Sequence, residues 1–373
     1  MLYARAIQGN QHLEGFMKVL IAGDVYGADR GANYHMIQQK FVHGFARNGH
    51  AVHVFNDRQT ARYATPLHNR KLGTRRANAL FLETCRTYRP DLVFLGHCEI
   101  LRNDTLEAVR AAVPGVRIAY RNVDPIYDFE HANHARIAAR TGTVDTIFVT
   151  TAGERLTPFA GGRARVHFMP NPVDPAVETL RQFDKPAETL PTDVVYGFMG
   201  LQKASETATG EDSRLRLSKQ LKQRLPDTRF EIRGLDYPPV RGQAYFDAIA
   251  RARIGLNYSR VNDHYLYSSD RMAHYTGCGL LTLVDRASGF GDLFGEDELA
   301  FYSDTDELIA RIVQFRDDDA ARRRVARAGW RKAHALFDVA RVARYIESAV
   351  FGVRAREDYE WPTAPAGPRK GLT

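Results

Sequence analysis

The chain of 373 residues is 44% hydrophobic and 26% charged, a composition typical of a globular protein with room for two ordinary domains. Its three cysteines include no C-x-x-C pair, which argues against a disulfide framework and against a zinc site of the usual spacing. The longest apolar runs have strand length and the N-terminus lacks the apolar core of a signal peptide, so we expect a cytoplasmic protein without membrane spans.

Short apolar runs alternate with helix-like segments along nearly the whole chain. We expect strands at residues 18–23, 50–56, 92–96, 116–122, 146–151, 166–171, 194–200, 229–234, 254–259, 280–285 and 299–303. Many of these runs are apolar throughout, which is typical of strands covered on both faces of a parallel sheet. Helices expected at 32–48 and 74–88 fit the same rhythm. The predicted fold class is α/β, with two Rossmann-like, doubly wound domains.

A proline-rich stretch at 171–193, NPVDPAVETLRQFDKPAETLPTD, interrupts this rhythm. A second break is the sharp start MKVLIAGD at Met17, which follows a segment without clear pattern. We therefore predict an extension at 1–16, a first domain at 17–175, a linker at 176–192, a second domain at 193–336, a returning helix at 337–352 and a flexible tail at 353–373.

Polar residues follow the expected strands in both halves of the chain. Ligands of an open parallel sheet bind beyond the carboxyl ends of its strands, so these residues are the site candidates. In the first half they are Asp24, His97 and Asp124. In the second half the candidates for binding phosphate, sugar hydroxyl or base are Gly200, Lys203, Arg233, Asn257, Arg260 and Tyr267.

The stretch 268–281, SSDRMAHYTGCGLL, predicts a short helix that leads into a buried strand. Ser268 or Ser269 suits the N-cap, and a helix N-terminus suits a diphosphate. Arg271 would add donors for phosphate oxygens, while Asp270 and His274, one turn apart, could bind hydroxyls. The alternative is a helix that only packs, with Asp270 as a cap and His274 as a core histidine.

Other patterns in the chain are weaker. Asp128, His131 and His134 have the spacing of a metal face, but such a pattern recurs by chance, and we expect no metal. A P-loop, a G-x-G-x-x-G after the first strand and a G-x-S-x-G are all missing, which disfavours a phosphotransferase, a dehydrogenase and an α/β-hydrolase.

The excess of basic residues, a net charge of +8, favours an anionic partner. Much of it lies in the segment 321–345, where a helix would place arginines opposite an apolar side. Such a face is usually just solvated. Peripheral contact with the inner face of a membrane, or with a lipid-linked or polyanionic acceptor, stays open. We expect no nucleic-acid partner, because the basic residues do not alternate with exposed aromatic ones.

Two segments in the second half carry a family resemblance. SDRMAHYTGCGLLTLVD at 269–285 and GFGDLFGEDELAFYSDTDELIARI at 289–312 resemble the C-terminal part of group 1 glycosyltransferases of the spore-maturation, CgeB-like branch. In the first half RPDLVFLGH, RIAYRNVDP and HFMPNPVD are similar to the same branch. The resemblance spans about 17–350 and implies a GT-B fold, in which two Rossmann-like domains face a central cleft and a C-terminal helix crosses back.

The resemblance also implies an activity. A sugar would move from a nucleotide-sugar donor in the second domain to a hydroxyl acceptor, a glycan or a lipid-linked molecule, in the first, without a metal or another cofactor. Bacterial surface glycan or glycoconjugate assembly is the expected setting. Arg271 matches the family arginine and Gly279 a family glycine. His274 stands where the family has a glutamate, and Leu266 where that glutamate has its acidic partner, so both acids are absent.

A glycosyltransferase must neutralise a departing phosphate group and direct an acceptor hydroxyl to the anomeric carbon. Arg271, Arg233 or Lys203 could stabilise the leaving group. Asp124, His97 or Asp24 could act as the base, and Asp124 is preferred because the following proline keeps it extended. The alternatives are a nucleotide-sugar 2-epimerase on the same frame and a non-catalytic nucleotide-sugar binding module.

Overall fold

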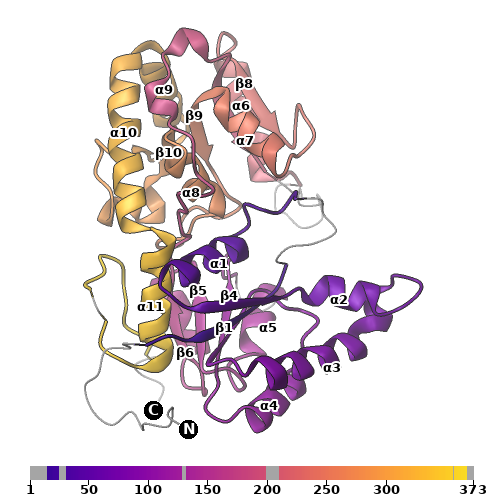
Figure 1. The fold of residues 1–373 in the computed structure, drawn as a ribbon. Coiled ribbons are helices and arrows are strands. Elements are labelled where there is room, and N and C mark those ends of the chain that lie inside the picture. The colour runs from indigo at the N-terminus through magenta and orange to yellow at the C-terminus, as the bar shows by residue number, and fades with distance from the viewer. Residues whose placement is uncertain (1–14, 25–30, 128–131, 199–209, 356, 368–373) are drawn as a thin grey trace.

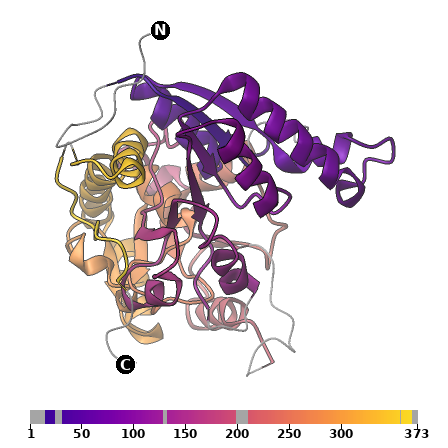
Figure 2. The ribbon, with the colours of Figure 1, turned by 90° about the horizontal axis from the view of Figure 1, so that it is seen from below.

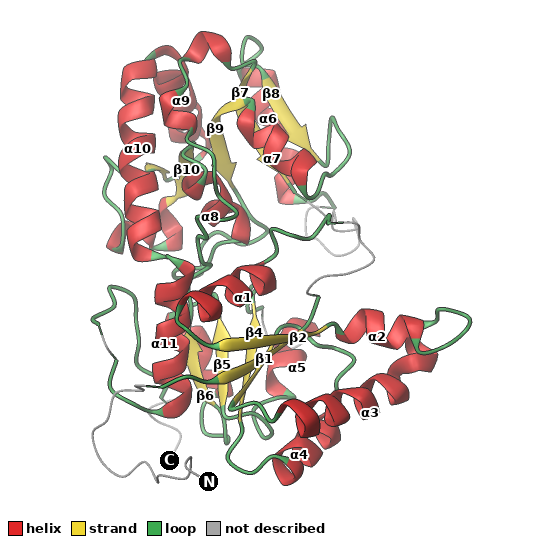
Figure 3. Ribbon diagram, viewed as in Figure 1, coloured by secondary structure: helices red, strands yellow, loops and turns green. Residues whose placement is uncertain are grey.

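The computed structural model describes residues 15–24, 31–127, 132–198, 210–355 and 357–367, which form two α/β domains, one above the other in Figure 1. Each domain has a parallel sheet at its centre with helices on both faces (Figure 3). The predicted α/β class with two doubly wound domains is therefore confirmed. Among the described residues, no helix is long and apolar enough to cross a membrane.

The first sheet contains, within the described residues, six parallel strands in the order β2-β1-β3-β4-β5-β6. The strands are β1 (Lys18–Ala22), β2 (Ala51–Phe55), β3 (Leu92–Leu95), β4 (Arg117–Asn122), β5 (Thr146–Val149) and β6 (Arg165–Phe168). β3 and β5 are buried along their whole length, which explains why their sequences are apolar on both faces. The polar residues that follow β1 and β4 therefore meet at one edge of this sheet.

Helices α1 (Ile37–Arg47), α2 (Asp57–Tyr63), α3 (Arg70–Tyr88), α4 (Asn103–Ala112) and α5 (Ala132–Ala138) complete the first domain. α1 starts five residues after the start of the helix expected at 32–48, because residues 31–35 form turns. α2 and α3 form a hairpin that projects from the domain in both views (Figures 1 and 2). The hairpin is closely packed: a Cβ on Gly73 would lie 1.7 Å from the carbonyl oxygen of Ala61.

The second sheet has five parallel strands within the described residues, in the order β11-β10-β9-β7-β8. They are β7 (Thr192–Gly197), β8 (Phe230–Arg233), β9 (Ala252–Asn257), β10 (Leu281–Asp285) and β11 (Ala300–Tyr302). Helices α6 (Ser213–Arg224), α7 (Gln243–Ala250), α8 (Asp270–Gly277), α9 (Thr305–Asp317) and α10 (Asp319–Leu336) surround it. Each expected strand thus has a counterpart, and β7 begins one residue before the predicted domain boundary.

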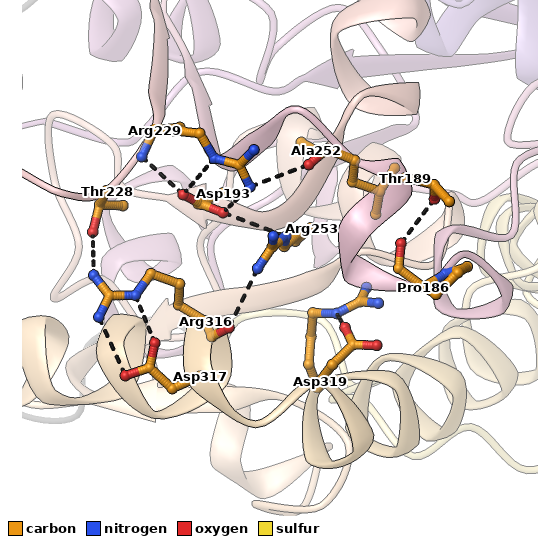
Figure 4. A network of polar contacts seen from close by, with 12 residues as sticks. Pro186, Thr189, Asp193, Thr228, Arg229, Ala252, Arg253, Arg316, Asp317 and Asp319 are labelled. Atoms are coloured by element: carbon orange, nitrogen blue, oxygen red, sulfur yellow. Dashed lines mark hydrogen bonds and ion pairs between the residues drawn. The ribbon is translucent and has the colours of Figure 1, made fainter.

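A polar network closes the second sheet where β7 and β9 begin (Figure 4). The buried carboxylate of Asp193 accepts hydrogen bonds from Arg229, with Nη2 at 2.8 Å, and lies 3.3 Å from Nε of Arg253. Burial alone would raise the pKa of Asp193, but these arginines outweigh it and lower the pKa. The network lies at the amino ends of the strands, so it supports the sheet and leaves the carboxyl ends available for a ligand.

Helix α11 (Val339–Phe351) leaves the second domain and packs beside α1 of the first, as predicted (Figure 1). The hydroxyl of Tyr345 donates to the carbonyl oxygen of Phe168, 3.0 Å away. The predicted flexible tail is wrong for its described part. Trp361 is buried against Phe337, which removes its apolar indole from water. The amide of Ala366 donates to the carbonyl oxygen of Val166 at 2.8 Å, which covers the open edge of the sheet at β6.

Candidate functional site

A cleft of about 460 Å³ lies between the two domains, where the carboxyl ends of both sheets face each other. The first domain contributes residues that follow β1 and β4, together with residues before and within its first helices: Asp24, Asn33, His35, Met36, Arg58, Asp124, Pro125 and Tyr127. The second domain contributes the ends of β7, β8 and β9, the segment before α7 and the start of α8. The cleft therefore lies beyond the carboxyl ends of the strands of both sheets, which is where open parallel sheets bind ligands.

The charge of the cleft is mainly positive. Six of the described lining residues are arginines and three are aspartates, the arginines being Arg58, Arg214, Arg233, Arg241, Arg260 and Arg271. Three of these arginines have acidic neighbours outside the lining: Arg214 pairs with Asp212 and Arg233 with Glu231, both at 2.6 Å, and Arg58 with Glu99 at 3.4 Å. The other three, Arg241, Arg260 and Arg271, all lie on the second-domain wall, which suits an anionic ligand such as a diphosphate.

Helix α8 points its first turn at the cleft. Ser269 occupies the N-cap position, yet its hydroxyl caps no backbone amide and is buried without a partner among the described residues. Arg271 donates to the carbonyl oxygens of Gly197 and Tyr258, at 2.6 and 2.5 Å, and so joins the ends of β7 and β9. The Ser269 hydroxyl thus makes no hydrogen bond among the described residues at the cleft wall. Part of the Arg271 guanidinium, by contrast, already bonds the backbone at the ends of β7 and β9.

His274 connects the cleft to a buried ion pair. Its Nδ1 lies 2.6 Å from Oε1 of Glu178 in the linker, and the same carboxylate oxygen pairs with the Lys40 ammonium of α1. Burial alone would raise the pKa of Glu178, but Lys40 and His274 outweigh it and lower the pKa to about 2. An ionised carboxylate only accepts hydrogen bonds, so Nδ1 carries a hydrogen. The other ring nitrogen, Nε2, is buried without a hydrogen-bond partner among the described residues, 4.0 Å from Asp270.

Aromatic and imidazole rings pack around His274. The ring of His35 lies 5.5 Å from that of His274, and Tyr245 lies at the same distance on another side. Burial is the main cause that lowers the pKa of His35 to about 4, so this ring is neutral at pH 7. The neighbours thereby exclude water from His274 while its Nε2 remains at the cleft wall.

The facing wall in the first domain is acidic. The Asp24 carboxylate accepts from the side-chain amides of Asn33 and Asn56, at 3.4 and 3.3 Å. The Asp124 side chain is 48% exposed, and its nearest basic partner, Arg136, is 3.9 Å away. Asp124 is thus an accessible carboxylate opposite the arginines. His97 does not line the cleft; burial lowers its pKa, and the negative charge of Asp124 partly offsets this effect.

Polar contacts between the two domains cross the cleft or its rim. Tyr127 of the first domain and Arg260 of the second form a side-chain hydrogen bond. The amide of Ala152 donates to the carbonyl oxygen of Tyr265 at 2.8 Å. The two walls of the site are therefore connected directly, and not only by the linker.

Of four further predicted residues, one lines the cleft and three do not. Tyr267 lines the cleft with its ring largely buried. Asn257 is buried beneath it, and Ser268 lines a separate small cavity, where its carbonyl accepts from Asn171 at 2.9 Å. Gly279 lies beyond α8, where a Cβ would meet Phe183 at 2.6 Å, so its close approach is to the linker and not to the cleft.

Several predicted residues cannot be placed. Gly200 and Lys203 lie outside the described residues, as do Asp128 and His131 of the metal-like spacing. The third member of that spacing, His134, packs on Phe159 with ring centroids 4.6 Å apart. The described residues contain no group of three side chains arranged to hold a metal ion.

Nothing in the sequence pointed directly to Lys40, Glu178 or His35. Lys40 could have been suspected, because Gln38, Gln39 and Lys40 all fall on the buried part of α1, where a polar run needs partners. Glu178 carries no such signal, since its partners are 138 and 96 residues away in the chain.

Comparison with known proteins agrees with this geometry. A family model described as glycosyl transferase-like matches residues 214–348, which include Arg233, Arg260 and the whole of α8. No curated protein sequence matches the chain. The match covers most of the second domain and agrees with the predicted resemblance of this segment to glycosyltransferases.

Solved structures confirm the GT-B fold over nearly the whole chain. Sucrose-phosphate synthase from Thermosynechococcus elongatus has a TM-score of 0.56 at 14% identity, covering 89% of this chain and 98% of that one. Anabaena HepE in complex with UDP and glucose has a TM-score of 0.53 at 16% identity, covering 90% and 100%. An E. coli trehalose-6-phosphate protein bound with UDP-2-fluoro glucose has a TM-score of 0.55 at 11% identity, covering 91% and 100%. None of these matches tests the CgeB-like branch.

Proposed function

We propose that this protein transfers a sugar from a nucleotide-sugar donor, held by the second domain, to a hydroxyl acceptor held by the first. The observation that carries the proposal is the cleft itself, in which arginines at the ends of one parallel sheet oppose the carboxylates of Asp24 and Asp124 at the end of the other. A family model for glycosyl transferase-like proteins matches the arginine-bearing half. Two structures of the same fold are in complex with UDP and glucose or with UDP-2-fluoro glucose, which supports the same donor class here.

The donor would lie against the second domain. Arg260 and Arg241 would contact the diphosphate, with the first turn of α8 adding backbone N–H groups and the Ser269 hydroxyl. His274 would accept a hydrogen bond from a hydroxyl of the ribose or the sugar through Nε2, because Glu178 holds the hydrogen on Nδ1. The contacts of the arginines, the backbone N–H groups and the Ser269 hydroxyl with the phosphates strengthen as negative charge develops on the leaving group, so they stabilise the transition state.

The acceptor would lie against the first domain. Asp124 would take the proton of the attacking hydroxyl, since it is the accessible carboxylate opposite the arginines. Asp24, held by two asparagine amides, would orient the acceptor. His97 would act only through Asp124, because it does not reach the cleft.

The finer predictions belong to this proposal as well. They are membership of the CgeB-like branch, hexosyl or other glycosyl transfer without a metal, a glycan or lipid-linked acceptor in surface glycan assembly, and a cytoplasmic location with peripheral contact at the inner face of the membrane. The arginine excess supports transfer without a metal, because guanidinium groups can neutralise a diphosphate themselves.

A thermal-shift panel of UDP-, GDP-, CMP-, ADP- and dTDP-sugars tests the donor site. A ligand at a hundred times its dissociation constant adds about 2.7 kcal/mol of stability, which raises the melting temperature of the wild-type protein. We expect one nucleotide class to do so. Arg260→Ala should weaken that binding about 10- to 100-fold, since a hydrogen bond to a charged group contributes about 1.5–3 kcal/mol.

His274→Ala and Arg324→Ala complete the panel. His274→Ala should weaken binding about 3- to 10-fold, through the loss of one neutral hydrogen bond of about 0.5–1.5 kcal/mol. Arg324, exposed on α10, is the matched control and should bind like wild type. If no nucleotide sugar shifts the folded wild-type protein, the proposed donor site is wrong.

A further inference from the structure

The tip of the α2–α3 hairpin, residues 62–76, stands away from the body of the first domain (Figures 1 and 2). Seven consecutive residues, 66–72, are exposed. None of them lines the cleft or either of the two other cavities found among the described residues. The tip therefore has no role in the site described above.

The tip is strongly basic. The chain contains no aspartate or glutamate between Asp57 and Glu83, while the tip carries five basic residues: Arg62, Arg70, Lys71, Arg75 and Arg76. All five are exposed, and within the described residues none forms an ion pair. Their combined positive charge is thus presented to solvent and is available to an external anionic surface.

The tip also carries exposed apolar side chains. Leu67 is 79% exposed, Leu72 61% and Tyr63 52%. These three are among only seven large hydrophobic side chains that are exposed in the described part of the chain. A cluster of exposed leucine and tyrosine within a ring of unpaired cations is typical of a surface that enters the headgroup region of a membrane. Aliphatic leucines would add nothing to binding a nucleic acid.

The tip is held in shape before any partner arrives. The side chain of Asn69 accepts from the amides of Lys71 and Leu72, at 2.9 and 3.4 Å, and so caps α3. The crossing at Gly73 and Ala61 fixes α2 against α3. Because α2 and α3 are held in place, Leu67 and Leu72 cannot turn back onto the domain and stay exposed to water. Such fixed exposure of two leucines indicates a binding surface.

The C-terminal basic segment differs in this respect. Arg322 pairs with Asp319 at 2.7 Å, and Arg327 with Asp184 at 2.8 Å. Arg341 and Arg344 both pair with Glu357. Much of the positive charge at 321–345 thus holds the second domain, the linker and the tail together, and it is less available to a partner than the charge of the hairpin tip.

We propose that the tip of the α2–α3 hairpin docks on the surface of an anionic phospholipid bilayer, with its leucines in the headgroup layer and its cations against lipid phosphates. This inference rests on the peripheral membrane contact named under the proposed function and assigns it to one surface; its test requires no turnover, so its failure is distinguishable from failure of the proposed transfer. Arg58 lines the cleft at the base of the same hairpin, and α2 is seven residues, about 10 Å, long. Docking would therefore hold the acceptor side of the cleft near the bilayer.

Vesicle flotation of the full chain tests the docking. We compare vesicles of phosphatidylcholine with vesicles that also contain phosphatidylglycerol, and expect binding to the second. Arg70→Glu/Lys71→Glu should weaken this binding at least 25-fold, since each basic residue at an anionic surface contributes about five-fold. Leu67→Ser/Leu72→Ser should weaken it at least about ten-fold through the lost apolar contact.

Arg324→Glu/Arg331→Glu is the matched control, because it changes the net charge by the same amount at exposed positions of α10. It should bind vesicles like wild type, and all variants should keep the wild-type melting temperature. Equal losses in the control and the hairpin variant would overturn the docking site, as would unchanged binding of the serine variant. Binding to RNA or heparin but not to the anionic vesicles would assign the tip to another partner.

Discussion

His274 shows how a residue that departs from a family pattern can keep a polar role. The resemblance expects a carboxylate at this position, and the structure provides one directly behind it, from Glu178. The ring thus places a polar nitrogen at the cleft wall, with an orientation held by the contact between Nδ1 and Glu178. Leu266, at the partner position, is buried with a φ of 54°, so the second acid of the family pair has no substitute there.

The Lys40–Glu178–His274 cluster makes stability depend on pH. Because the folded-state pKa of Glu178 is lowered to about 2, its contribution is present above its unfolded value of about 4.5 and is lost as pH falls between the two. Glu178→Gln should reduce the free energy of unfolding by about 3–5 kcal/mol at pH 7, since Lys40 loses its buried partner.

Urea unfolding of wild type and Glu178→Gln from pH 7 to pH 3 measures this dependence. The difference between the two proteins should shrink below about pH 4.5. A difference of constant size across this range would show that the ion pair is not the source of the effect.

At the scale of elements, the contact between α2 and α3 depends on one glycine. A Cβ at Gly73 would overlap the carbonyl oxygen of Ala61, so Gly73→Ala should force the helices apart and cost about 1–3 kcal/mol. Gly142→Ala is the control, because a Cβ there has no neighbour within 4 Å. Denaturant unfolding should separate the two variants clearly; equal stability would mean that the hairpin crossing is looser than described.

The sequence predicted strands better than helix limits. The strands are recognised because burial on both faces makes them apolar throughout, as in β3 and β5. The start of α1 was missed because the preceding turns carry residues that also suit a helix. Trp361 was assigned to a flexible tail because one buried indole in a proline-rich segment gives no periodic signal.

The candidate site could be predicted only in part. Strand ends converge at one edge, and Asp24, Asp124, Arg233 and Arg260, which follow strands in the sequence, all line the cleft. His97 was a candidate by the same pattern, and Gly279 by the family resemblance, but neither lines it. Glu178 could not be found, since contact between distant segments follows from the packing of α1, the linker and α8 together.

At the scale of the whole molecule, the two domains are connected by more than the linker. α11 packs on the first domain, Lys40 reaches across to Glu178, and Tyr127 bonds Arg260 over the cleft. A donor that binds Arg260 would compete with the Tyr127 contact, while His274 is held from both domains. The walls of the cleft are therefore connected at several points besides the linker.

The central claim is that the cleft transfers a sugar, and the release of nucleoside diphosphate from the stabilising nucleotide sugar tests it most directly. We predict slow release by the wild-type protein, with the sugar freed to water when no acceptor is present. Asp124→Asn should bind the donor equally well, but its rate of nucleoside diphosphate release should fall at least about 100-fold, as expected for the loss of a general base. A nucleotide sugar that stays intact in the cleft, or returns as its 2-epimer, would contradict the account.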